Sequence, residues 1–318
     1  MHPVRLDPVG LSGPTRGAAR GPRWQRVAPG WYLPAAADLG VVEQRILAQS
    51  VRLPPSGAVT AWASLRWRGV AFFAGVGHAG APVAVPLVIS GSGSRAAHVS
   101  VHYSWEQLSP SEREIVDGLP CTTVERALFD EVRRRGTIRD GAVAIDMTAA
   151  ANLLTVAEFA QYVDRRPAWT GVGVARGAVD LASDGSRSPQ ESRMRLVWVI
   201  DADLPAPLCN QPLFSLDGDL LGYPDLFDPV AGLVGEYDGA DHLEEDRRRR
   251  DRMREERFRD HGLEYVAVVT GELARPASVV RRLRAAYRRA PFDPPDERRW
   301  TLDQPPWFRS RLDRQSHA

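Results

Sequence analysis

The sequence predicts a multidomain protein of the α/β class. The chain has 318 residues, more than one small core usually organises, so two or three domains are expected. Segments with helical spacing of apolar residues alternate with short strand-like segments in which apolar and polar residues alternate. A polar stretch rich in Gly and Ser, Leu181–Gln190, separates two such series. This stretch marks the main domain boundary.

The composition indicates a soluble protein that we expect in the cytoplasm, without a membrane partner. Hydrophobic residues make up 43% of the chain, and no apolar run approaches the ~18–20 residues of a membrane span. The first residues lack the apolar core of a secretory signal. The net charge is +1, and all 41 basic residues are arginines. Cys121 and Cys209 are far apart, which predicts ordinary buried thiols rather than a disulfide or zinc site.

In the first half of the chain we expect a disordered start, a small β-wing, and then helices and strands. Residues 1–22 are rich in Gly, Pro and Arg without periodicity, which favours poor order. The run RWQRVAPGWYLP (23–34) alternates around a Pro-Gly turn, and its aromatic residues Trp24, Trp31 and Tyr32 are more consistent with sheet packing than with base stacking. Helices are expected at Val41–Val51, Ala58–Arg66, Thr122–Arg135 (opened by a Thr-x-x-Glu cap), Ile138–Ala151 and Thr155–Asp164, and strands in VAVPLVI and HVSVHYSW.

The second half shows a regular order of elements. After the boundary we expect a helix, three strands joined by the DGD and DPVAG turns, an Arg-rich helix, a strand and a helix. Their expected ranges are Glu191–Asp201, Pro212–Leu216, Gly222–Phe227, Leu233–Tyr237, Asp246–His261, Glu264–Thr270 and Ala277–Ala290. The Pro-rich residues after 290 are expected to be irregular.

Three carboxylates are expected to converge on the hairpin in this half. Side chains alternate along a strand, so Glu236 and Asp238 point to the same face. If the two strands pair antiparallel, Asp225 lies opposite Glu236 on that face. Like charges so close are unfavourable, and a hard divalent cation such as Mg²⁺ or Mn²⁺ resolves the conflict. Glu191 opens the preceding helix, where a capping role explains it at least as well as a functional one.

The order of these elements, with SPQESR, Pro224-Asp225, GEYDG and the GLEYVAVVTGEL close, resembles the PD-(D/E)XK nuclease superfamily over about Ser186–Ala290. The similarity is strongest to its Vsr-like branch of very-short-patch-repair endonuclease relatives. The resemblance implies a restriction-endonuclease-like αβββαβ core and a magnesium-dependent DNA endonuclease. It further implies that Asp225 and Glu236 bind the metal, with Glu191 as an outer ligand. Asp238 occupies the position where the superfamily usually has a lysine, and His242 is expected to act as general base or to position water.

The run RRRRDRMREERFRD allows two interpretations. Charged runs usually form solvated helix faces, and the acids at i to i+4 spacing would pair with the arginines there. Alternatively, the first four arginines contact DNA phosphates beside the acidic face, because the guanidinium fork matches phosphate geometry. Those four candidate nucleic-acid-binding residues are Arg247, Arg248, Arg249 and Arg250.

The first half also resembles a known family. RWQRVAPGWYLP is similar to the wing of AbiEi-type antitoxins, and AVTAWASLRWRGV with DGLPCTTVERALFDEVRRR is similar to the domain that follows. This implies a transcriptional regulator of a type IV toxin-antitoxin system, with a winged helix truncated before Trp24. The expected domains are therefore a winged-helix remnant (1–57), an antitoxin-like α/β domain (58–185), the nuclease-like domain (186–290) and a Pro-rich tail (291–318).

Three classes of function follow from these patterns. The first is a metal-dependent DNA endonuclease linked to repair, defence or a toxin-antitoxin system. The second is a non-catalytic DNA-binding antitoxin or regulator that retains a nuclease fold, and the third is an interaction protein with neither activity. DNA is the expected partner, with a cognate toxin or a repair protein as a further one. RNA as a substrate and the oligomeric state stay open.

Overall fold

The computed structural model describes residues 1–77, 80–91, 95–239 and 245–308, with only the backbone for 245–251. The chain is mixed α/β and divides into two compact units, Met1–Asp180 and Leu181–Ala318. The division falls at the first residue of the polar stretch expected to be a boundary. Across the described residues, no helix combines the length and the apolar composition that a membrane crossing needs.

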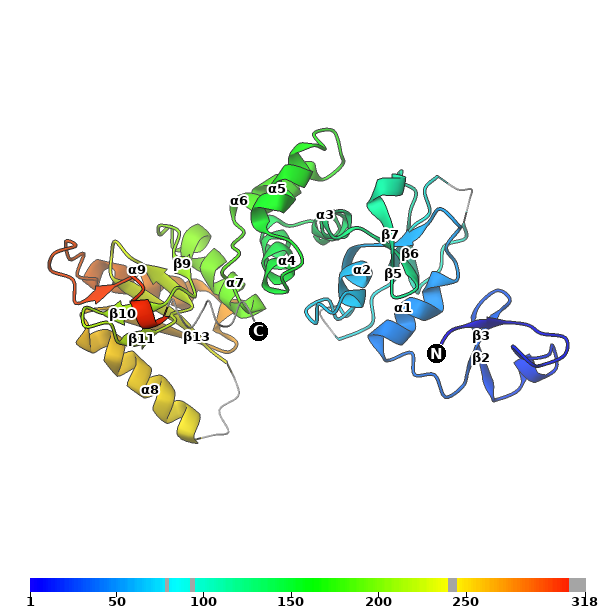
Figure 1. Cartoon of the computed structure of the whole chain (residues 1–318), viewed down its shortest axis with the longest axis horizontal. Helices are drawn as coiled ribbons and strands as arrows, with labels where there is room; N and C mark the ends of the chain where they lie inside the picture. Colours follow the sequence, from blue (N-terminus) through cyan, green and yellow to red (C-terminus); the bar gives the residue numbers. More distant parts are fainter. Residues whose placement is uncertain (78–79, 92–94, 240–244, 309–318) are drawn as a thin grey trace. The chain divides into compact units, whose positions relative to one another are not determined.

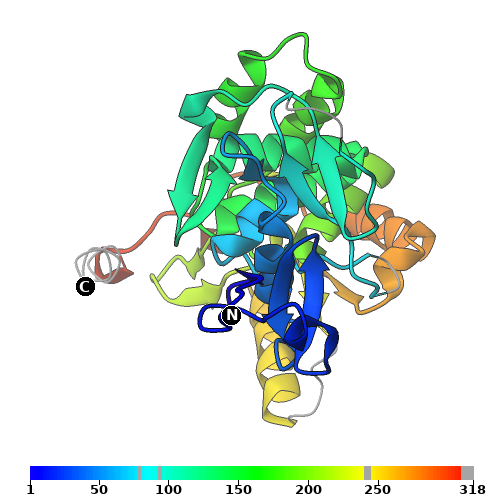
Figure 2. The ribbon, with the colours of Figure 1, turned by 90° about the vertical axis from the view of Figure 1, so that its right-hand side faces the viewer.

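The first unit opens with a small antiparallel sheet in the order β1-β3-β2, drawn in blue in Figure 2. β1 covers Val4–Arg5, and β2 (Trp24–Ala28) and β3 (Trp31–Pro34) form the expected wing. The aromatic ring of Trp31 packs against a cluster that includes Leu33, as the packing interpretation predicts. Ala48 of α1 (Val42–Ser50) belongs to the same cluster.

The expectation that residues 1–22 are poorly ordered is wrong. Val4–Arg5 form strand β1, which pairs with β3, and a short 3₁₀ turn covers Ala18–Arg20. The Asp7 carboxylate accepts hydrogen bonds from the backbone N–H groups of Val9, Leu11 and Ser12 at 2.8–2.9 Å. These bonds, led by that from Ser12, lower the pKa of Asp7 to about 2. Local side-chain bonding thus orders a segment whose composition suggested disorder.

A five-stranded sheet in the order β6-β5-β4-β8-β7 follows. Its strands are β4 (Ala58–Val59), β5 (Val85–Val88), β6 (Val101–Ser104), β7 (Arg113–Val116) and β8 (Leu119–Thr122). The helix expected from Ala58 begins later, because Val59 is buried in the sheet between Leu87 and Cys121. α2 therefore covers Ala61–Trp67. Cys121 and Cys209 are both buried thiols.

Helices α3 (Val124–Arg135), α4 (Ile138–Ala150), α5 (Val156–Asp164) and α6 (Val172–Asp180) complete the first unit. The first three were expected, and α6 was not. The cap expected at the start of α3 does not form, because Thr123 is the N-cap and its side chain makes no capping bond. A complete capping box instead opens α5, where Thr155 and Glu158 bond reciprocally.

The second unit contains a four-stranded sheet, β14-β13-β12-β9, and a smaller one, β11-β10-β15. The strands are β9 (Leu208–Cys209), β10 (Leu213–Ser215), β11 (Leu220–Gly222), β12 (Leu226–Asp228), β13 (Leu233–Asp238), β14 (Glu264–Val269) and β15 (Trp300–Thr301). The helices are α7 (Pro189–Leu196), which continues as a π-turn over Val197–Asp201, α8 (Glu245–Asp260) and α9 (Ala277–Arg289).

Helices cover both faces of the larger sheet (Figure 1). On one face, α7 and α9 pack on a core that includes Leu226 and Leu233. Gly235 lets α7 approach closely, since a Cβ there would lie 2.8 Å from Met194 Cε. On the other face, Phe258 of α8 packs against Val234. By alternation, the side chains that follow Val234 on this face lie under α8.

Two predictions about this unit need correction. The strand expected over Gly222–Phe227 is broken, because Pro224 lacks a backbone N–H and Gly222 has a φ of 155°. The chain leaves the small sheet after β11 and joins the larger one at β12. The Pro-rich tail is also more regular than expected. Its residue Trp300 is 4% exposed and lies in β15. The ring of Trp300 packs edge-on against that of Phe227, with the ring centroids 4.9 Å apart.

Candidate functional site

The break before β12 places Asp225 at a corner between the two sheets of the second unit. β12 pairs antiparallel with β13, with Leu226 opposite Gly235, as predicted. Continuing this register by one residue brings Asp225 opposite Glu236. The backbone N–H of Tyr237 donates to Asp225 Oδ2 at 2.7 Å, which fixes the carboxylate against β13. Glu236 is 3% exposed.

The Asp225 carboxylate is destabilised in its charged form. Burial raises its pKa to about 6, and the negative charge of Glu191 contributes in the same direction. The hydrogen bond from Tyr237 and the charges of Arg254 and Arg187 oppose the shift without cancelling it. A carboxyl group whose pKa is raised by burial and by a second acid gains from a bound cation.

Glu191 lies at the start of α7, as the capping interpretation expects. Ser188 is the N-cap of α7 and its side chain accepts from Glu191 N at 3.2 Å, so Glu191 lies in the positively polarised first turn. Its Oε2 atom accepts from Arg187 N at 2.9 Å and from Asn210 Nδ2 at 2.8 Å. The capping position therefore holds the carboxylate near enough to Asp225 to influence its pKa.

Asp238 is the last residue of β13 and lies on the same face as Glu236 by alternation. Its backbone carbonyl accepts from Thr270 N at 3.1 Å, and its side chain is partly buried. His242 lies outside the described residues. The four arginines 247–250 lie in α8, but their side chains are outside the described part. Their roles stay predictions.

Arg254 is a functional candidate that the sequence patterns did not single out. Its Nη2 atom lies 2.9 Å from Glu236 Oε2, and the two side chains are 36% and 4% exposed. The position follows from helical spacing, because Phe258 one turn later is buried against the sheet. Arg254 therefore points toward the same face as the acids and compensates part of their charge.

The donor chemistry at the corner fits a hard divalent cation. Mg²⁺ is usually held by one or two carboxylates together with water and substrate phosphate. Asp225 and Glu236 supply that number of carboxylates from neighbouring strands. Among the described residues, no group of three or more His, Cys, Asp and Glu side chains is arranged to hold a metal. A cation here would therefore depend on water and phosphate for its other ligands.

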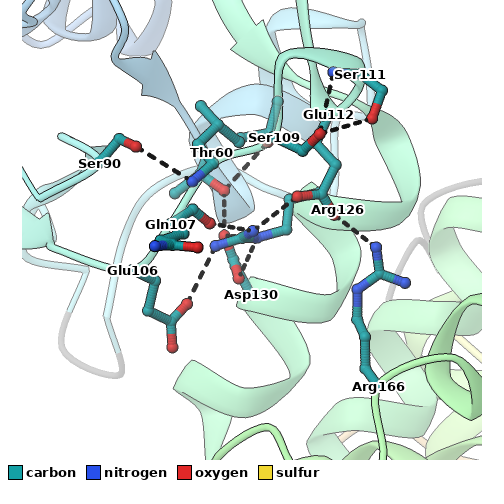
Figure 3. Close-up of polar contacts among 12 residues, drawn as sticks. Thr60, Ser90, Glu106, Gln107, Ser109, Ser111, Glu112, Arg126, Asp130 and Arg166 are labelled. Carbon is teal, nitrogen blue, oxygen red and sulfur yellow. Dashed lines mark hydrogen bonds and ion pairs between the residues drawn. The ribbon is translucent and has the colours of Figure 1, made fainter.

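A second cluster of charges, which the sequence patterns also did not indicate, lies in the first unit (Figure 3). Arg126 of α3 is fully buried, and its guanidinium donates to three acids. The contacts reach Asp130 at 3.0 Å, Glu106 at 3.1 Å and Glu112 at 3.1 Å. Glu112 also binds Arg166 of the segment after α5 at 2.6 Å. One arginine thus connects α3 to the loop that precedes β7.

The charges of this cluster balance. Arg133 adds a third guanidinium, with Nη2 at 2.7 Å from Glu106 Oε2 and 2.6 Å from Asp130 Oδ1. The hydrogen bond from Arg133, with the charges of Arg133 and Arg126, holds the pKa of Glu106 below its ordinary value. Thr60 Oγ1 donates to Asp130 Oδ2 at 2.6 Å. Three guanidinium groups meet three carboxylates, which is the pattern of a structural network rather than of a ligand site.

Comparison of the chain with protein-family models, with curated proteins and with solved structures gave no match. The resemblances to the nuclease superfamily and to the antitoxins therefore rest on their sequence motifs.

Proposed function

We propose that the second unit is a metal-dependent DNA endonuclease similar to the Vsr-like branch of the PD-(D/E)XK superfamily. The observation that carries the proposal is the partly buried Asp225 carboxyl, whose pKa is raised to about 6, opposite the buried Glu236. The succession of α7, the strands β10 to β13, α8, β14 and α9 supports a restriction-endonuclease-like core. The first unit would then be the antitoxin-like part with its truncated winged helix.

In this proposal Asp225 and Glu236 hold Mg²⁺ or Mn²⁺, and Glu191 and Asp238 support the site. A divalent ion held by these carboxylates would supply two effects: a lower pKa for water at the site and neutralisation of the charge that develops on the scissile phosphate. His242 accepts or orients a proton of the attacking water. The four arginines at the start of α8, Arg247 to Arg250, hold the DNA backbone.

In this proposal Arg254 supplies the positive charge that the superfamily usually takes from a lysine. The chain has no lysine, and Asp238 occupies that position in GEYDG. The guanidinium of Arg254 comes from α8 instead, and its Nη2 atom lies 2.9 Å from Glu236 Oε2. If Glu236 held a cation, the guanidinium of Arg254 would pair less strongly with that carboxylate and would be placed to contact a phosphate oxygen.

The alternative function is a non-catalytic DNA-binding regulator or antitoxin, with a toxin or repair protein as its partner. The ion pair itself favours this alternative, because Arg254 already neutralises Glu236 without any metal. A protein of this class would bind DNA equally well with and without Mg²⁺. It would also tolerate loss of Asp225.

The two functions are separated by relaxation of supercoiled plasmid in Mg²⁺ or Mn²⁺, with DNA binding followed by gel shift. The variants are Asp225→Asn and, as the matched control, Glu255→Gln, which alters an exposed carboxylate on α8 paired with Arg259. If the second unit is an endonuclease, Asp225→Asn loses nicking and keeps DNA binding, whereas Glu255→Gln keeps both. Nicking that persists in Asp225→Asn, or that is absent from wild type, contradicts the proposal.

A further inference from the structure

Asn210 joins three segments around the candidate site in the second unit. It lies just after β9 and has a φ of 52°, in the left-handed region that Asn tolerates better than most residues. Its backbone N–H points at the corner before β12 and donates to Pro224 O at 3.0 Å and to Asp225 O at 3.3 Å. The main chain of Asn210 therefore holds the backbone of the corner that carries the Asp225 carboxylate.

The side chain of Asn210 binds the carboxylate of Glu191. Its Nδ2 atom donates to Glu191 Oε2 at 2.8 Å and to Gly185 O at 2.9 Å. Both acceptors are oxygens, so the two N–H bonds of the amide are used and the orientation of the amide is fixed. Aspartate, which has the same shape, has no donor to offer at neutral pH.

The contacts of Asn210 keep the Glu191 carboxylate in place despite the nearby negative charge of Asp225. Asn210 bonds to the side chain of Glu191 and to the backbone of Asp225, so two acids with like charge are held near each other. A glutamate at the partly exposed start of a helix has several rotamers that would carry its charge into water. The amide of Asn210, together with Arg187 N, removes that freedom by occupying Glu191 Oε2.

We infer that Asn210 is a positioning residue that clamps Glu191 against the Asp225 corner and so preorganises the carboxylates for a divalent cation. This inference rests on the proposed function. Its contacts are with a supporting acid and with the backbone of Asp225 rather than with substrate. Partners of this kind typically change metal affinity by roughly 10- to 100-fold when removed.

The test uses Asn210→Gly in the full chain. Glycine adopts the left-handed φ and keeps the backbone N–H, so only the amide side chain is lost. Asn210→Asp is the second variant, since it keeps the shape and places a charge beside Glu191. The matched control is Asn152→Gly, because Asn152 also has a positive φ, of 55°, but lies in the first unit.

Mn²⁺ alone is the probe, and its affinity is measured by calorimetry beside the melting temperature and the kcat and KM for plasmid nicking. We expect Asn210→Gly to weaken Mn²⁺ binding roughly 10-fold or more, to lower kcat and to leave KM for DNA nearly unchanged. Asn210→Asp should weaken binding at least as much. Asn152→Gly should leave the affinity unchanged.

A double variant then connects the effect to the carboxylate. If the amide acts through Glu191, Asn210→Gly adds little to the loss already caused by Glu191→Ala. A Mn²⁺ affinity equal to that of wild type in both Asn210 variants overturns the inference. So does a loss of Mn²⁺ affinity from Asn210→Gly that is the same in wild type and in Glu191→Ala. Wild type that binds no Mn²⁺ overturns the proposed function and this inference together, and that result is recognised before any variant is made.

Discussion

Arg254 of α8 and Glu236 of β13 form an ion pair across one face of the sheet, with Nη2 2.9 Å from Oε2. The glutamate is almost fully buried, whereas the arginine is partly exposed. The pair therefore joins a helix surface to a carboxylate that burial makes costly when charged. If the second unit is a metal-dependent nuclease, this carboxylate exchanges its guanidinium partner for a divalent ion.

Replacement of Arg254 by methionine should expose the cost of the buried Glu236 charge. We expect a loss of about 1–3 kcal/mol of unfolding free energy without metal, below the ~3–5 kcal/mol of a fully buried pair because Arg254 is partly solvated. Urea unfolding in EDTA and in Mg²⁺ measures this. Mg²⁺ should stabilise Arg254→Met more than wild type, since it replaces the missing cation. Equal responses to Mg²⁺ would contradict a carboxylate shared between Arg254 and the ion.

The raised pKa of Asp225 predicts a specific pH dependence of stability. Between its ordinary pKa of 3.8 and about 6, the folded state binds more protons at this group than the unfolded state. The stabilisation of the folded state by the protonated Asp225 is thus fully present below the ordinary pKa and is lost as the pH rises through about 6. In EDTA, wild type should lose up to about 3 kcal/mol relative to Asp225→Asn between pH 4 and pH 7. Parallel pH profiles of the two proteins would show that Asp225 titrates normally.

The arginine network of the first unit should be a strong stabilising element. Arg126→Met leaves Asp130, Glu106 and Glu112 without their shared donor, and we expect a cost of about 3–5 kcal/mol. Arg66→Gln is the control in the same unit, since its pair with Glu43 is more exposed. That change should cost about 1 kcal/mol or less. Denaturant unfolding of both variants measures the two losses of unfolding free energy. Losses of similar size would contradict a special role for Arg126.

The close packing of α7 on Gly235 gives a test of how rigidly Glu191 is supported. In Gly235→Ala the new Cβ meets Met194 Cε at 2.8 Å and Trp198 Cζ3 at 3.1 Å, which should cost about 1–3 kcal/mol. Gly239→Ala is the control, because no atom of the described residues outside its chain neighbours lies within 4 Å of a Cβ built there. We expect Mn²⁺ affinity to fall only in Gly235→Ala, as α7 shifts relative to β13. An unchanged affinity would show that the helix adapts without moving its first turn.

The sequence predicted the elements of the second unit where local patterns are strong. Alternation from Leu233 and the DPVAG turn predicted the pairing of β12 with β13, and Asp228 closes that turn by accepting from Val230 N and Ala231 N. The break at Pro224 was also readable, because proline does not suit the interior of a strand. In the first unit, Asp117-Gly118 is a hairpin signal for β7 and β8, and both residues have positive φ.

The contacts that define the site could not be predicted in this way. Asn210 lies in a Pro-rich segment without periodicity, and its partners Glu191 and Asp225 are 19 and 15 positions away. Arg254 is one of many arginines in α8, and only the packing of Phe258 determines which of them meets Glu236. Long-range contacts of polar side chains depend on how the sheets meet, which local propensity does not encode.

The most direct measurement is a calorimetric titration of Mn²⁺ into wild type and Glu236→Ala, with relaxation of supercoiled plasmid followed in the same samples. We expect wild type to bind the ion and nick the plasmid, and Glu236→Ala to do neither while retaining its fold by circular dichroism. Nicking that survives in Glu236→Ala, or a wild type that binds no ion, would contradict a metal-dependent nuclease site at this corner.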